Sequence, residues 1–242
     1  MHRALAHFHL GPMNLITAIS LFLFFSSIWF LFLHRVCRLW GRLLAWALPQ
    51  LPLNARLGFA NYHVGVFQFQ IPYLQIQPLL PNPLTWSLTT GISVLLFVLT
   101  LVLPKRFMPV SYLLRAVLLI QASALFYFAV WPLRFPHTPD SYMEGLISAG
   151  VGLISVIPLL FAFTYYIFDF GLWRKAFLTA LTMTHLALFL PFQVLLQGLL
   201  LQKSVLFMPL LYIVFGLPVD VLLIIAFYSW GMTWSFRNVA EA

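Results

Sequence analysis

Two apolar stretches near the end of the sequence decide its fold: FLTALTMTHLALFLPFQVLLQGLL (residues 177–200) and VLFMPLLYIVFGLPVDVLLIIAFYSWGMTW (residues 205–234). Each is longer than the ~20 apolar residues that an α-helix needs to cross the hydrocarbon core of a bilayer. Only a few residues, Lys203 among them, separate the two stretches, and short connections join antiparallel neighbouring helices. The sequence therefore predicts an antiparallel transmembrane hairpin.

Polar side chains lie deep inside both arms of this hairpin. In the first arm they fall within about 120° of arc when plotted at ~100° per residue, so they share one helix face. The residues on this face are Thr182, His185, Gln193 and Gln197. In the second arm Asp220 follows Pro218 closely, and a charged side chain at mid-bilayer costs about 2.5–3.5 kcal/mol on insertion scales. Because His185 and Asp220 lie about equally far from the connecting turn, we expect them to share one buried polar site.

The composition of the whole chain agrees with insertion into a membrane. Of 242 residues, 62% are hydrophobic and only 7% are charged, whereas about a quarter of the residues of soluble domains are charged. Apolar runs of ~20 residues recur and leave little sequence for a soluble domain. The sequence therefore predicts an all-α polytopic membrane protein, built as a single integral membrane domain over residues 1–242.

Six spans are expected from the apolar runs and the breaks between them. They cover residues 15–33, 84–103, 110–131, 145–168, 177–200 and 205–234. Gln121, near the middle of the third span, is expected to hydrogen-bond a neighbouring helix and belongs with the other intramembrane polar residues. In the fourth span Gly145, Ala149 and Gly152 are small residues at a spacing that lets another backbone approach. We expect this surface to make the tightest helix contact.

Between the first two expected spans the periodicity changes from helical to alternating. Apolar residues and glutamines alternate over residues 67–77, and a period of two is typical of a strand. Pro72 shifts the alternation, which indicates a bent edge strand or two short strands. We expect one short extramembrane β element near residues 62–77. A ribbon this small is marginally stable alone, so it packs either on its own helices or on the sheet of a partner.

The basic residues bear on orientation, because cytoplasmic loops carry an excess of Lys and Arg. If six simple crossings are drawn, the cluster of Arg35, Arg38 and Arg42 falls opposite the clusters that follow the later spans. The short apolar stretch at residues 43–53 either makes an additional, irregular crossing or lies flat as an interfacial helix. The first alternative is favoured, since it places all the basic clusters on a common cytoplasmic side.

Motifs for catalysis or nucleotide binding are absent from the sequence: it has no Walker loop, no dinucleotide-binding glycine pattern and no H-E-x-x-H. The single Cys37 excludes an internal disulfide and a multi-cysteine metal site, and we expect neither a metal nor another cofactor. Outside the hairpin, titratable groups gather in one place. His137 and Asp140 lie in the loop before the fourth span and Glu144 opens it, so these three residues form a second candidate site.

Three functions are compatible with these features. The leading expectation is a non-catalytic accessory or scaffold subunit of a larger envelope complex in the bacterial inner (plasma) membrane. The alternatives are a small transporter or lipid-handling permease that uses the polar intramembrane face, and a membrane enzyme that acts on a lipid-linked substrate through the His137 loop. The expected partners are the lipid bilayer and other membrane or envelope proteins. Nucleic acid is not expected, because the net charge of +8 comes mainly from basic residues at segment ends.

Overall fold

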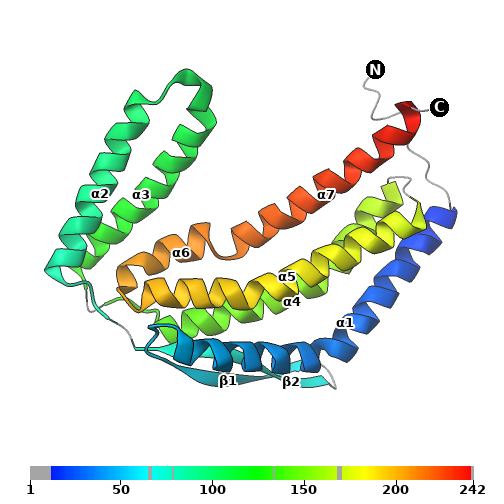
Figure 1. Cartoon of the computed structure of the whole chain (residues 1–242), viewed down its shortest axis with the longest axis horizontal. Coiled ribbons are helices and arrows are strands. Elements are labelled where there is room, and N and C mark those ends of the chain that lie inside the picture. The colour runs from blue at the N-terminus through cyan, green and yellow to red at the C-terminus, as the bar shows by residue number, and fades with distance from the viewer. Residues whose placement is uncertain (1–11, 65–66, 78, 133, 168–170, 241–242) are drawn as a thin grey trace.

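The computed structural model describes residues 12–64, 67–77, 79–132, 134–167 and 171–240. Within these ranges the chain consists of long α-helices, short 3₁₀ turns and one two-stranded sheet (Figure 1). Six helical stretches are long and apolar enough to cross a membrane. The predicted all-α polytopic class is therefore confirmed, and the protein is an integral membrane protein.

The first helix is far longer than the span expected at residues 15–33. α1 covers Pro12–Ala47, a length of about 54 Å at ~1.5 Å per residue, whereas the hydrocarbon core is only ~30 Å thick. Figure 1 shows that α1 bends and that its second half runs alongside the sheet. No separate crossing helix forms at the stretch of residues 43–53. Its first residues continue α1, and a 3₁₀ turn at Leu48–Gln50, containing Pro49, ends the helical stretch.

The β element is an antiparallel hairpin of β1 (Ala55–Val64) and β2 (Phe67–Ile76). The prediction for residues 62–77 is confirmed for β2, but most of β1 precedes that interval, because its sequence does not alternate apolar and polar residues. Pro72 does not divide β2, and it lies opposite Phe59 in a continuous pairing. A two-stranded ribbon leaves one free edge on each strand, where proline is tolerated.

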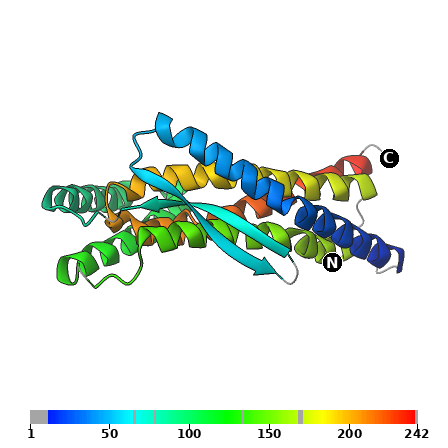
Figure 2. The ribbon, with the colours of Figure 1, turned by 90° about the horizontal axis from the view of Figure 1, so that it is seen from below.

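The hairpin packs on helices of its own chain. Apart from Pro72, the buried side chains of β2 change from odd to even positions across that proline: they are Phe69, Ile71, Leu74 and Ile76. Through this face β2 contacts α1, α4 (Pro139–Ile167) and α5 (Leu172–Leu201). Figure 2 shows the hairpin crossing these helices diagonally. Of the two alternatives for the ribbon, packing on its own helices is therefore the one observed.

The remaining helices form two groups. α2 (Pro83–Val102) and α3 (Met108–Val130) form a hairpin that stands apart from the other helices in Figure 1, with α3 in contact with α6. The last expected span is broken: α6 (Met208–Val214) and α7 (Leu217–Ala240) are separated at Phe215 and Gly216. α7 packs against α4 and α5.

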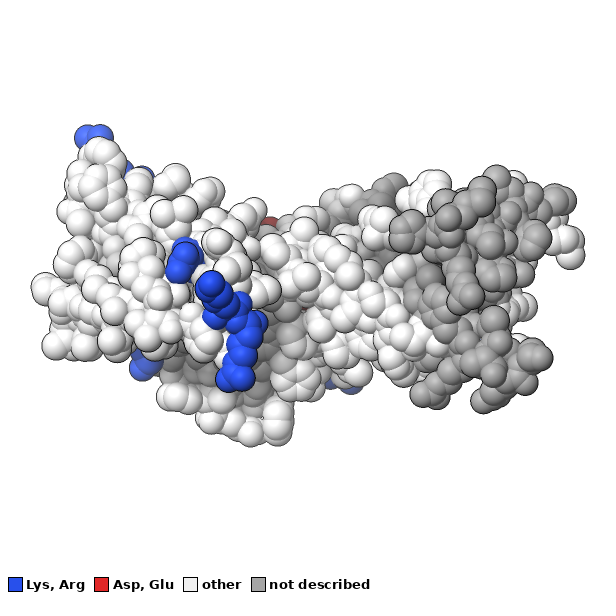
Figure 3. Space-filling model, turned by 90° about the horizontal axis from the view of Figure 1, so that it is seen from above, with Lys and Arg blue, Asp and Glu red and all other residues white. Residues whose placement is uncertain are grey.

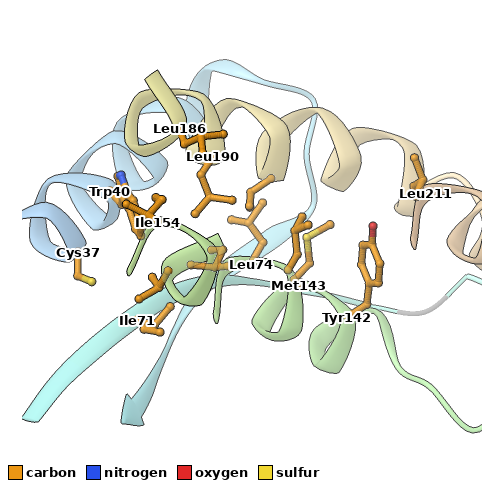
Figure 4. Close-up of a cluster of buried hydrophobic side chains, with 14 of the residues drawn as sticks. Cys37, Trp40, Ile71, Leu74, Tyr142, Met143, Ile154, Leu186, Leu190 and Leu211 are labelled. Atoms are coloured by element: carbon orange, nitrogen blue, oxygen red, sulfur yellow. The ribbon is translucent and has the colours of Figure 1, made fainter. Parts of the chain in front are cut away.

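The buried core lies where β2 meets α1, α4 and α5. In Figure 4, aliphatic and aromatic side chains from these four elements point toward one another, with Leu211 of α6 at one end. Two tryptophans fix α1 to its neighbours: Trp40 donates its indole N–H to the Ala187 carbonyl at 2.7 Å, and Trp29 donates to Ser155 Oγ at 2.8 Å. A buried indole N–H needs such a partner, so these bonds set the position of α1 along α4 and α5.

The close approach expected at Gly145, Ala149 and Gly152 is not present. All three residues are exposed, and a Cβ at Gly145 or Gly152 would meet nothing within 4 Å. The buried face of α4 instead carries Gly150, where a Cβ would lie 2.6 Å from the side chain of Leu190. The small-residue spacing therefore identified the right helix but the wrong face.

Candidate functional site

The loop site does not assemble around its histidine. Asp140 accepts a hydrogen bond from the backbone N–H of Ile76 at 2.7 Å, and Glu144 accepts one from the Tyr62 hydroxyl at 3.0 Å. The ring of His137 packs against Phe135, and in the described ranges it makes no hydrogen bond to either carboxylate. Both acids therefore tie the β hairpin to the first two turns of α4.

Removing the Tyr62 hydroxyl is expected to loosen this tie. In Tyr62→Phe, amide exchange in β1 should become about fivefold faster, the factor that corresponds to ~1 kcal/mol for one hydrogen bond. Burial raises the pKa of Tyr62, and Glu144 adds to the rise. The contribution of the tie is therefore fully present below pH 10 and is lost as the pH rises through the pKa of the folded state.

The control for this variant is Tyr73→Phe, because the Tyr73 hydroxyl bonds only to Gln75 of the same strand among the residues that the structure covers. Hydrogen exchange followed by mass spectrometry measures both variants. Equal exchange in β1 of the two variants would contradict the role given to the bond between Tyr62 and Glu144.

The intramembrane polar face meets the helix break between α6 and α7. A helix break leaves backbone carbonyls without partners, and such groups must find donors inside the protein where no water is present. The side-chain amides of Gln193 and Gln197 each donate to the Phe215 carbonyl at 2.6 Å, and Gln193 also reaches the Gly216 carbonyl at 3.4 Å. Gln197 in turn accepts a hydrogen bond from the Tyr142 hydroxyl. One polar network therefore joins α4, α5 and the break.

Glycine is required at the break because the backbone turns tightly there. A Cβ on Gly216 would lie 2.7 Å from the backbone carbonyl oxygen of Tyr212, which cannot move aside as a flexible side chain would. Pro218, in the first turn of α7, has no N–H and is well placed there, because this position needs no donor. Gly216 and Pro218 together end α6 and start α7.

Asp220 lies in the first turn of α7, where the helix N-terminus favours negative charge. It is only 3% exposed. It borders a cavity too small to hold a water molecule, and the other residues that line this cavity are Gly150, Leu153, Ile154, Leu186 and Leu190. Within the described part of the chain, its carboxyl group has no hydrogen-bond donor and no cation beside it. A carboxyl group is thus buried among apolar side chains of α4 and α5.

Among the residues that the structure describes, His185 makes no hydrogen bond or ion pair with Asp220. Its half-buried ring packs on Phe189 at 5.9 Å and on Phe227 of α7 at 4.9 Å between ring centroids. Phe227 lies seven residues beyond Asp220, or about 10 Å along α7. The two residues therefore occupy successive levels between α5 and α7. The expected match in depth treated residues 205–234 as one straight helix, and the break at Gly216 changes that geometry.

Two other predicted residues do not contribute to the network. Thr182 is buried, but its hydroxyl donates to the Leu178 carbonyl of its own helix at 2.8 Å. Gln121 is 4% exposed, and neither its amide nitrogen nor its amide oxygen has a partner in the described structure. The expected hydrogen bond from Gln121 to a neighbouring helix is therefore wrong, since the described residues that pack against α3 offer its amide neither a donor nor an acceptor.

Two features of the site were not predicted. The first is Tyr142, which the sequence places at the end of a loop and the structure places in the first turn of α4, with its hydroxyl on Gln197. The second is the backbone carbonyl of Phe215, which no side-chain pattern reveals. Gly216 and Pro218 together are a sequence signal for a complete helix break. Such a break predicts backbone carbonyls that need amide donors.

Comparison with known protein families, curated proteins and solved structures gives no match for this chain. In the described residues, no group of three His, Cys, Asp or Glu side chains could hold a metal ion. The features that bear on function are therefore the helix break and the buried Asp220.

Proposed function

We propose that this protein is a small membrane transporter in which Asp220 binds and releases a proton beside the break between α6 and α7. The observation that carries the proposal is a carboxyl group that is almost fully buried in apolar surroundings, without a donor or cation in the described structure. Ionisable residues inside membrane spans are costly and mark ion or proton pathways. The N-terminus of α7 favours a negative charge at this position, but no described residue binds the carboxyl group, so a proton is the partner that we propose for it.

A proton fits the site better than a metal cation. The cavity beside Asp220 cannot hold a water molecule, so it has no room for a hydrated ion. The binding of a proton needs no added volume and removes the charge from the apolar surroundings. Among cations, the proton is thus the one that this closed arrangement can accept.

The broken helix supplies the movement that a transporter needs. In transporters, discontinuous helices place binding sites at the break, and their half-helices can move separately. Here the Phe215 carbonyl is held by the two flexible amides of Gln193 and Gln197. These amides can follow a small displacement of α7 without leaving the carbonyl unbonded. Such a displacement would open the apolar cavity beside Asp220 to one side of the membrane.

Infrared difference spectra recorded at a series of pH values test the proton site directly. Wild-type protein in liposomes should show a carboxylic acid C=O band that disappears on deprotonation. In Asp220→Asn this band should be missing, while elution volume and Tm stay unchanged, because an amide replaces the carboxyl group in size. Glu144→Gln is the control, since it removes an acid that is already bonded to Tyr62. If Asp220→Asn kept all the carboxylic acid bands of the wild type, at the same frequencies and with the same pH dependence, the assignment would be overturned.

Proton flux is the functional measurement. Vesicles that contain a pH-sensitive dye should lose an imposed pH gradient at least about tenfold more slowly with Asp220→Asn than with the wild type, as expected when an essential proton carrier is removed. Glu144→Gln should behave as the wild type. Equal fluxes through the wild type and Asp220→Asn would contradict the transport proposal.

A second candidate function is that of an accessory or scaffold subunit of a larger envelope complex. It is supported by β1, which has one edge without a strand partner and carries exposed side chains, so a partner strand can add to it. For either function we propose a location in a plasma membrane, such as the bacterial inner membrane. Purification in mild detergent from native membranes tests this candidate. A stoichiometric partner supports it, and a chain that purifies alone argues against it.

A further inference from the structure

An elongated cavity of about 380 Å³ lies between α2 and α3. One end is formed by Trp86 and Leu125, and the Trp86 indole N–H donates to the Leu125 carbonyl at 3.1 Å. The other end is formed by Phe97 and Arg115. Phe97 is eleven residues from Trp86 on α2, so the cavity is about 16 Å long. It has one apolar end and one cationic end.

The guanidinium at the cationic end is held in place but not neutralised. Arg115 donates from Nε to the Thr100 hydroxyl at 3.1 Å and from Nη2 to the Thr100 carbonyl at 3.0 Å. It also lies 5.7 Å from the ring of Tyr112. An arginine side chain has five N–H groups. The contacts of Arg115 with the described residues do not use all of them, so some donors remain for a ligand.

A counter-charge is missing from this part of the chain. The first 139 residues contain no Asp or Glu, so α2, α3 and the turn between them carry Lys105, Arg106 and Arg115 without a carboxylate. Figure 3 shows basic side chains gathered on the half of the molecule that carries α2 and α3, with almost no other charge on the described part of that face. An anion from outside the chain can therefore balance the charge of Arg115.

We propose that this cavity binds one anionic phospholipid of the bilayer, with an acyl chain between α2 and α3 and the phosphate group on Arg115. If each chain carbon takes ~30 Å³, as a water molecule does in the liquid, the cavity holds about a dozen carbons. The polarity of the cavity matches a lipid in a leaflet, because the cationic end lies toward the turn with Lys105 and Arg106. Arginine also binds phosphate in a bidentate manner. This site is separate from Asp220 and does not depend on the proposed transport.

The first test compares the lipids that stay bound. The protein is reconstituted with equal amounts of phosphatidylglycerol and phosphatidylcholine, released from the bilayer and examined by native mass spectrometry. The wild type should retain one phosphatidylglycerol in preference to phosphatidylcholine. Arg115→Gln should lower that preference about tenfold, the factor expected for loss of a charge-assisted contact. Arg56→Gln removes the same charge from an exposed position on β1 and should leave the preference unchanged.

A second variant separates loss of binding from loss of folding. Ala122 lines the cavity, so Ala122→Phe should fill it and abolish lipid retention while Arg115 and Thr100 stay in place. Ala129→Phe, on an exposed position of α3 outside the cavity lining, is the matched control and should retain the lipid. The proposal is overturned if the wild type shows no preference for phosphatidylglycerol, or if Ala122→Phe retains it as the wild type does.

Discussion

Gln197→Leu is expected to lower the free energy of unfolding by roughly 1–3 kcal/mol, while Gln121→Leu leaves it unchanged or raises it. Both positions are buried glutamines in membrane-spanning helices, with exposed fractions of 1% and 4%. The leucine at position 197 removes an acceptor from the Tyr142 hydroxyl and a donor from the Phe215 carbonyl. The leucine at position 121 removes an amide that has no partner in the described structure.

The same substitution should therefore destabilise the protein at position 197 and not at position 121. A buried polar group that has no hydrogen bond is unfavourable, so its replacement by an apolar side chain of similar volume removes an unfavourable term. The measurement is unfolding in detergent, followed by the loss of helical signal at increasing denaturant. Equal destabilisation by Gln197→Leu and Gln121→Leu would show that the network at the break does not stabilise the protein.

Gly150→Leu is expected to destabilise the protein by about 3 kcal/mol, whereas Gly152→Leu should be tolerated. At position 150 even the first added carbon lies 2.6 Å from Leu190, and the rest of the leucine must enter a packed interface between α4 and α5. At position 152 the side chain enters open space. Leucine favours helix over glycine by nearly 1 kcal/mol at either position, so the difference between the variants isolates the packing effect.

The yield of monodisperse protein and its Tm in detergent report this difference. Ala149→Leu, at an exposed position just before Gly150, adds a control in which no glycine is replaced. If Gly152→Leu were as damaging as Gly150→Leu, the face of α4 that packs on α5 would be misassigned.

The helical class was predictable from sequence because it depends on local composition. A run of ~20 apolar residues can cross a bilayer whatever its neighbours are, so the sequence identifies all six helical stretches that are long and apolar enough to cross a membrane among the described residues. The length of α1 was not predictable in this way. Hydropathy marks where a helix meets lipid, but Arg35, Arg38 and Arg42 can continue the same helix beyond the bilayer. Most of strand β1 was not predicted either, because Gly58 and its neighbours show no alternation of apolar and polar residues.

The candidate site was only half predictable. Helical periodicity placed Gln193 and Gln197 on one face, and the structure places both side chains on the same carbonyl. Their partner is the backbone of Phe215, and a backbone carbonyl becomes available only when a helix breaks, which depends on how Gly216 packs against the turn before it. Periodicity also gives no rotation of one helix against another. This explains why the exposed Gly145 and Gly152 were favoured over the buried Gly150.

The hydrogen bond from Ile76 to Asp140 has a consequence for how the chain can vary in length. This 2.7 Å bond holds the end of β2 beside the start of α4. The chain therefore leaves the main helix bundle and returns to it at nearly the same point. The residues between these two points include α2 and α3, and the bond from Ile76 to Asp140 holds the two ends of this segment together. Insertions, deletions and exchanges are tolerated best where the flanking ends lie close together. The α2 and α3 hairpin can thus change its length, and with it the size of its cavity, while the end of β2 stays hydrogen-bonded to the start of α4.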